Sequence, residues 1–115
     1  MTIAIYHNPR CSKSRQTLEL LRNQGIEPTI IEYLKTPPSI DELKAVIKAL
    51  GIAPRDLLRK GEAIYKELGL HDSNPSDEAL IQAMVTHPVL IERPIVIRGD
   101  KAAIGRPPES VLTLL

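Results

Sequence analysis

One cysteine stands among cations and short polar side chains near the N-terminus. Cys11 is the single cysteine of the 115 residues, and it follows a His-Asn-Pro-Arg segment at residues 7–10. The pattern from Ser12 onward predicts a helix, so Cys11 lies at its start, where unpaired N–H groups carry a partial positive charge. That charge, together with nearby Arg10 and Arg15, favours the thiolate. We therefore interpret Cys11 as an activated nucleophile; a buried structural cysteine is the alternative.

Three arginines lie at expected element boundaries, next to glycine or proline. They are Arg59, Arg93 and Arg106. Loops at such boundaries place functional groups on a rigid frame. A guanidinium binds a tetrahedral oxyanion through paired hydrogen bonds and keeps its charge, and a helix N-terminus also binds anions. The arrangement predicts a nucleophile beside an anion site; three solvated surface arginines are the alternative.

The histidines and the residues that follow Cys11 limit the reaction types that the sequence can support. A histidinium at His7 would favour the thiolate, whereas a loop histidine that only bonds the backbone is the alternative. His71 and His87 are expected to be structural, and no His, Asp and Glu set has ligand spacing, so no metal is predicted. A phosphatase loop would need arginine where Thr17 stands, and a dithiol oxidoreductase would need cysteine where Ser14 stands.

Composition limits the classes of partner and the compartment. The net charge is +1, and the aromatic residues are three tyrosines without Phe or Trp, so we expect no nucleic-acid partner. No apolar run reaches the length of a membrane helix and no signal peptide opens the chain, so we expect no membrane association. A single cysteine excludes an internal disulfide, and a lone thiol stays reduced in the cytoplasm, which is the expected location.

The hydrophobic pattern predicts strands towards both ends of the chain and helices between them. Strands are expected at residues 3–6, 29–33, 94–97 and 101–104. Helices are expected from Cys11 to Gly25, from a Ser39–Glu42 capping box to Gly51, from Pro54 through Leu58, over residues 62–68, from Ser76 to His87 and from Pro107. The first helix makes the first two strands parallel, and the last two return antiparallel. We expect one α/β domain over residues 1–115: a thioredoxin-like fold with a mixed sheet and an inserted helical segment at about residues 39–87.

Four segments resemble the glutaredoxin-linked arsenate reductases of the ArsC family. They are HNPRCSKSR at residues 7–15, LLRK at 57–60, HPVLIERPIV at 87–96 and GRP at 105–107. The resemblance covers nearly the whole chain. It implies that Cys11 attacks arsenate and that Arg59, Arg93 and Arg106 hold the oxyanion.

The resemblance also implies roles for neighbouring residues and for the source of electrons. His7 and Ser14 match residues that help to lower the thiol pKa, and a cis peptide is expected before Pro94. Supporting roles are expected for Asn8, Arg10, Arg15 and Pro94. No cofactor is expected to be bound. Reduction of arsenate needs a second thiol, which this chain lacks; the resemblance implies glutathione as co-substrate and glutaredoxin as the partner that clears the mixed disulfide.

Two other functions remain open from the sequence. The same fold would serve an Spx-like regulator that binds RNA polymerase, although such a protein needs no cationic oxyanion pocket. A glutathione-dependent reductase of another substrate is the second alternative, because a pocket of one cysteine and several arginines accepts several anions.

Overall fold

The computed structural model describes residues 2–71 and 75–115. These form two compact units, Met1–Thr36 with Arg93–Leu115 and Pro37–Glu92. The second unit contains the helical segment expected at residues 39–87. The loop expected between His71 and Pro75 includes residues 72–74, which lie outside the described residues.

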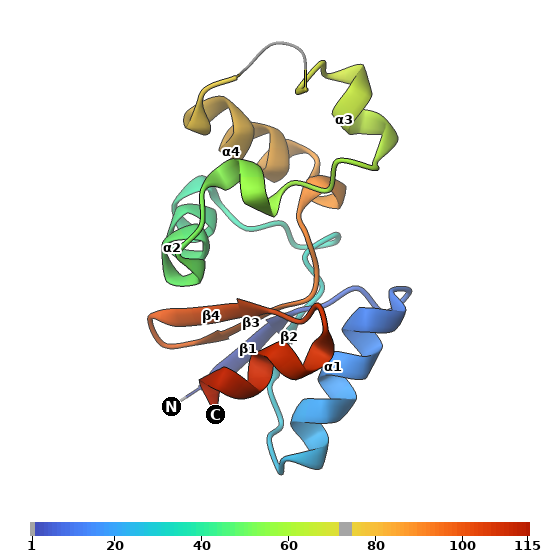
Figure 1. Cartoon of the computed structure of the whole chain (residues 1–115), viewed down its shortest axis with the longest axis vertical. Coiled ribbons are helices and arrows are strands. Elements are labelled where there is room, and N and C mark those ends of the chain that lie inside the picture. The colour runs from blue at the N-terminus through green and yellow to red at the C-terminus, as the bar shows by residue number, and fades with distance from the viewer. Residues whose placement is uncertain (1, 72–74) are drawn as a thin grey trace. The chain divides into compact units, whose positions relative to one another are not determined.

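The first unit contains a four-stranded mixed sheet (Figure 1). Its strands are β1 (Ile3–Tyr6), β2 (Thr29–Ile31), β3 (Ile95–Arg98) and β4 (Lys101–Ile104), in the order β2-β1-β3-β4. β1 pairs parallel with β2 and antiparallel with β3, and β3 pairs antiparallel with β4. This arrangement confirms the predicted α/β, thioredoxin-like fold.

The second strand is shorter than the predicted 29–33. β2 ends at Ile31 because the Glu32 carbonyl accepts hydrogen bonds from the N–H groups of Lys35 and Thr36, so the chain turns there. Tyr33 is nevertheless fully buried, and its ring stacks on that of Tyr6 with centroids 6.2 Å apart. Within residues 29–33 the buried side chain is therefore Tyr33, which lies beyond the strand, whereas Ile30 in β2 is 40% exposed.

Two helices cover the same face of the sheet, α1 (Ser12–Asn23) and the 3₁₀ helix η3 (Pro108–Leu114), as Figure 1 shows. The core between sheet and helices consists of Ile3, Ile5, Leu18, Leu21, Val96, Val111 and Leu114. Side chains two apart on a strand share one face, which explains how β1 contributes both of its isoleucines. The core thus fixes α1, and with it Cys11, against β1 and β3.

The second unit is helical. It contains α2 (Ile40–Leu50), the 3₁₀ helix η1 (Pro54–Leu57), α3 (Ala63–Glu67), α4 (Asp77–Thr86) and the short 3₁₀ helix η2 (Pro88–Leu90). The predicted capping box is present: Ser39 Oγ accepts from the Glu42 N–H at 3.1 Å, and Glu42 Oε1 accepts from the Ser39 N–H at 3.2 Å. Gly51 ends α2 with φ 69°, a conformation that glycine adopts without strain. Among the described residues, no helix is both long and apolar enough to span a membrane.

Candidate active site

Cys11 occupies the N-cap position of α1, as the sequence predicted. The loop that leads to it is held by its own hydrogen bonds. The Cys11 N–H donates to the Asn8 carbonyl at 3.0 Å, and the Arg10 N–H donates to Asn8 Oδ1 at 3.0 Å. Arg15, one turn into the helix, donates from Nη1 to the Pro9 carbonyl at 2.9 Å. Asn8 and Arg15 therefore act on the loop backbone and fix where the thiol lies.

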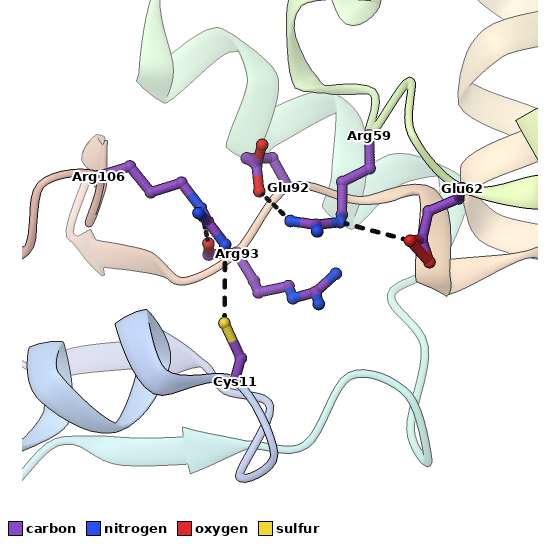
Figure 2. A network of polar contacts seen from close by, with 6 residues as sticks. All are labelled: Cys11, Arg59, Glu62, Glu92, Arg93 and Arg106. Atoms are coloured by element: carbon purple, nitrogen blue, oxygen red, sulfur yellow. Dashed lines mark hydrogen bonds and ion pairs between the residues drawn. The ribbon is translucent and has the colours of Figure 1, made fainter.

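Two arginines distant in sequence reach the cysteine from the β3–β4 hairpin. Arg106 Nη2 donates to Cys11 Sγ at 3.6 Å, and Arg106 Nε donates to the Arg93 carbonyl at 2.7 Å (Figure 2). Arg93 lies two residues before the start of β3, and the peptide bond between Arg93 and Pro94 is cis, as predicted. Pairing of β1 with β3 brings this hairpin to the start of α1. The fold thus joins Cys11, Arg93 and Arg106.

The electrostatic surroundings favour the thiolate of Cys11. Burial of the thiol opposes ionisation and raises its pKa. The backbone N–H of Ser14, the Arg93 guanidinium and the backbone N–H of Lys13 outweigh this, so the pKa of Cys11 lies below its ordinary value. The N–H groups at the start of α1 lower this pKa because they favour the charged sulfur. The activating cation is therefore Arg93, rather than the arginines adjacent in sequence.

Arg106 contacts the cysteine sulfur but is exposed to solvent. Its 3.6 Å approach to sulfur is a long hydrogen bond, and its side chain is exposed to solvent. Solvent screens an exposed charge, whereas Arg93 is half-buried and acts through both a hydrogen bond and its charge. After the backbone N–H of Ser14, Arg93 is the side chain that lowers the pKa of the Cys11 thiol, and Arg106 presents a second guanidinium beside it.

His7 acts on the site through Ser14. His7 Nδ1 lies 2.6 Å from Ser14 Oγ, which also accepts from the Asn8 N–H at 3.0 Å; all three residues are buried. Burial lowers the pKa of His7, Glu32 partly opposes this, and Arg22 and Arg15 add to it. This shift disfavours a histidinium beside the thiolate, and the part of His7 in lowering the pKa of Cys11 stays a prediction. A buried ring that is held by a hydroxyl resists protonation.

Gly105 belongs to the site, where its lack of a side chain has a role that was not predicted from the sequence. A Cβ at this position would lie 2.5 Å from Thr17 Oγ1 and 2.8 Å from Pro94 Cγ. Its N–H donates to the Pro94 carbonyl at 2.9 Å. The absence of a side chain lets the chain after β4 lie against α1, immediately before Arg106. Its position directly before a site arginine was the available signal.

Arg59 lies in the second unit, where it has carboxylate partners. Its Nη1 donates to Glu92 Oε1 at 2.6 Å, and its Nε lies 4.0 Å from a Glu62 oxygen (Figure 2). The backbone is anchored as well, because the Arg59 N–H donates to the Leu90 carbonyl at 2.7 Å. The pairing with Glu92 was not anticipated from the sequence. The assignment of Arg59 to an oxyanion stays a prediction.

The described part of the chain also contains other histidines and further side chains of the types that can bind a metal ion. His71 stacks on Tyr65 with ring centroids 5.8 Å apart, which agrees with its predicted structural role. Within residues 2–71 and 75–115, no group of three or more His, Cys, Asp or Glu side chains is placed to hold a metal ion. At this site the Cys11 thiolate can act as a nucleophile towards an anionic group that the guanidinium ions of Arg93 and Arg106 bind.

These features define a thioredoxin-like protein with one activated cysteine at the start of its first helix and arginines from the opposite hairpin. Comparison with known families gives the particular group. The model of the ArsC family matches residues 6–114, and the chain belongs to that family.

Individual relatives match over their full length. An arsenate reductase from Haemophilus influenzae is 52% identical over 116 residues and covers 100% of both chains. The uncharacterised protein YfgD from Escherichia coli is 55% identical over 98% of this chain and 96% of its own. The solved structure of an arsenate reductase from Vibrio cholerae superposes with a TM-score of 0.97 at 56% identity, covering 100% of this chain and 98% of the other.

Proposed function

We propose that this protein is an arsenate reductase that converts arsenate to arsenite. The observation that carries the proposal is the thiolate-favouring environment of Cys11 beside the Arg106 and Arg93 side chains. A thiolate supplies the nucleophile, and guanidinium groups bind the tetrahedral oxyanion. Arsenate reductases of about the same length and half identical in sequence support arsenate as the substrate.

In the first step, the Cys11 thiolate attacks As(V). An S–As bond forms, one arsenic–oxygen bond breaks, and the departing oxygen leaves as water after taking up protons. Arg93 and Arg106 hold the remaining oxygens and the covalent adduct, where preorganised cations stabilise developing charge. Arg59 is the third oxyanion-binding arginine, as the family resemblance implies.

In the second step, an external thiol supplies the electrons. This chain has one cysteine, so it cannot form an internal disulfide. A glutathione thiolate attacks the Cys11 sulfur, an S–S bond forms, and the electron pair of the S–As bond passes to arsenic, which leaves as arsenite. Glutaredoxin then clears the mixed disulfide. No bound cofactor is required, and the reducing cytoplasm is the setting in which both thiols persist.

The neighbouring residues prepare the nucleophile. Ser14 contributes its backbone N–H to the thiolate, and its hydroxyl is held by His7. Asn8 and Arg15 keep the loop in place. Arg10 and Pro94 have supporting roles in this proposal, as the family resemblance implies.

Arsenate-dependent NADPH oxidation tests the proposal, with glutathione, glutaredoxin and glutathione reductase present. Wild-type protein is expected to turn over, Cys11→Ser to be inactive, and mass spectrometry after one turnover to find glutathione on Cys11. Thioredoxin with its reductase is expected to replace glutathione poorly. Absence of turnover by folded wild-type protein would reject arsenate reduction. Efficient turnover with thioredoxin alone and no glutathione adduct would reject the electron source but keep Cys11 as nucleophile.

A further inference from the structure

A cavity opens on the side of the loop that precedes Cys11. It has a volume of about 320 Å³ and lies within the first unit. Its walls include Asn8, Pro9 and Arg10 from this loop and Glu32, Leu34 and Lys35 from the turn after β2. We call it the loop cavity. Its volume falls at the lower end of the range for small-molecule sites, about 300–1,000 Å³.

The wall of the loop cavity is hydrogen-bonded to the backbone of the nucleophile. Asn8 lines it and accepts a hydrogen bond from the Cys11 N–H at 3.0 Å. The wall is also rigid, because Asn8 is buried and its own N–H is bound to Ser14 Oγ. A ligand in this cavity would therefore rest on a rigid loop that leads directly to Cys11, the residue that carries the proposed arsenic adduct.

The charges around the loop cavity are mixed. Arg10 and Lys35 supply cations and Glu32 supplies an anion, with Lys35 Nζ 3.6 Å from Glu32 Oε1. A bare oxyanion would be repelled by the carboxylate of Glu32. A zwitterionic ligand with carboxylates and an ammonium group matches both signs. Leu34, 42% exposed, adds an apolar surface for methylene groups.

We propose that the loop cavity binds glutathione, the thiol that supplies the electrons for the reduction of As(V). This inference rests on the proposed function for the identity of the thiol. The two carboxylates of the tripeptide pair with Arg10 and Lys35, and its ammonium group pairs with Glu32. Bound there, the thiolate attacks the Cys11 sulfur of the adduct. The S–S bond forms, the S–As bond breaks, and its electron pair leaves with arsenic as arsenite.

A charge reversal tests the site kinetically. Lys35→Glu replaces an attraction for a carboxylate with a repulsion, and it is expected to raise the half-saturating glutathione concentration by about tenfold. Lys48→Glu in α2 makes the same change of net charge elsewhere and is expected to leave that concentration unchanged. With 2-mercaptoethanol, which has no charged groups to recognise, Lys35→Glu is expected to equal wild type. An equal effect with both thiols, or no effect with glutathione, would overturn the proposal.

A binding experiment separates this inference from the proposed function. S-methylglutathione cannot exchange with a disulfide, so it is titrated into Cys11→Ser protein and followed by amide NMR shifts. Shifts are expected at Asn8, Arg10 and Leu34, and they are expected to weaken in the Lys35→Glu background. Such shifts in a protein whose wild type reduces no arsenate would keep the site and reject the reaction. Turnover of arsenate without these shifts would reject the site and keep the reaction.

Discussion

Removal of the Arg106 guanidinium should make Cys11 harder to ionise. Two unit charges 3.6 Å apart, the distance from Arg106 Nη2 to Cys11 Sγ, attract by about 1.2 kcal/mol even at the dielectric constant of water. That energy corresponds to about a sevenfold change in the ratio of thiolate to thiol. Arg106→Ala should therefore raise the pKa of Cys11 and lower the thiolate fraction at any pH below it by up to about this factor.

The assay follows the ultraviolet absorbance of the thiolate as a function of pH. Because the thiolate is the reactive form, the rate of alkylation by iodoacetamide at fixed pH should fall in parallel. Lys101→Ala is the matched control: it removes a cation from the other end of the same hairpin, where Lys101 pairs with Arg98. The difference between the variants should shrink at high salt, since salt screens exposed charges.

Two results would refute this reasoning. An unchanged titration midpoint in Arg106→Ala would mean that solvent screens the guanidinium completely and that the ionisation of Cys11 depends on Arg93 and the helix N–H groups. An equal shift in Lys101→Ala would mean that net charge, rather than the 3.6 Å contact, sets the effect. Urea denaturation should show both variants within about 1 kcal/mol of wild type, because exposed charges contribute little to stability.

Three further predictions concern stability. In the folded protein the pKa of His7 lies below its ordinary value of 6.5. As the pH falls through about 6.5, the unfolded chain therefore binds more protons than the folded chain, and the free energy of unfolding decreases. His7→Gln lacks this group, so in urea titrations it should lose less stability than wild type between about pH 7 and pH 5. Gly105→Ala should cost about 1–3 kcal/mol by overpacking against Thr17 and Pro94, and addition of Thr17→Ala should restore part of this in thermal denaturation; wild-type stability of the single variant would contradict the close approach. Ser39→Ala should cost about 1 kcal/mol by loss of the α2 cap, measured by urea denaturation, and no change would show that the capping box contributes nothing.

Local signals in the sequence were sufficient for most elements of the fold. The capping box at Ser39 and Glu42 marks the start of α2, and Gly51 marks its end, because both act through hydrogen bonds and dihedral angles of neighbouring residues. The placement of Cys11 at the start of α1 followed in the same way. The exception among the strands is β2, where the apolar run continues to Tyr33 but the turn at Glu32 ends the strand.

Which cations contact the Cys11 sulfur could not be predicted from the residues adjacent to it in sequence. Sequence proximity suggested Arg10 and Arg15 as activating cations, whereas the cation that lowers the Cys11 pKa is Arg93, distant in the chain. Arg93 and Arg106 could be singled out by their boundary positions and the family resemblance. Their convergence on one sulfur depends on the register between β1 and β3.

By itself, the sequence determined the residue types that limit the chemistry: one cysteine, hence no internal disulfide, and a helix start that favours its thiolate. Only the tertiary structure shows the direction in which the pKa of His7 shifts and the need for Gly105. A histidine titrates according to its burial and its charged neighbours, and burial beside Ser14 lowers the pKa of His7. A glycine is required where another segment approaches its Cα, and that segment is Thr17 of α1. Both properties arise from contacts between residues that the chain order separates, so no local pattern contains them.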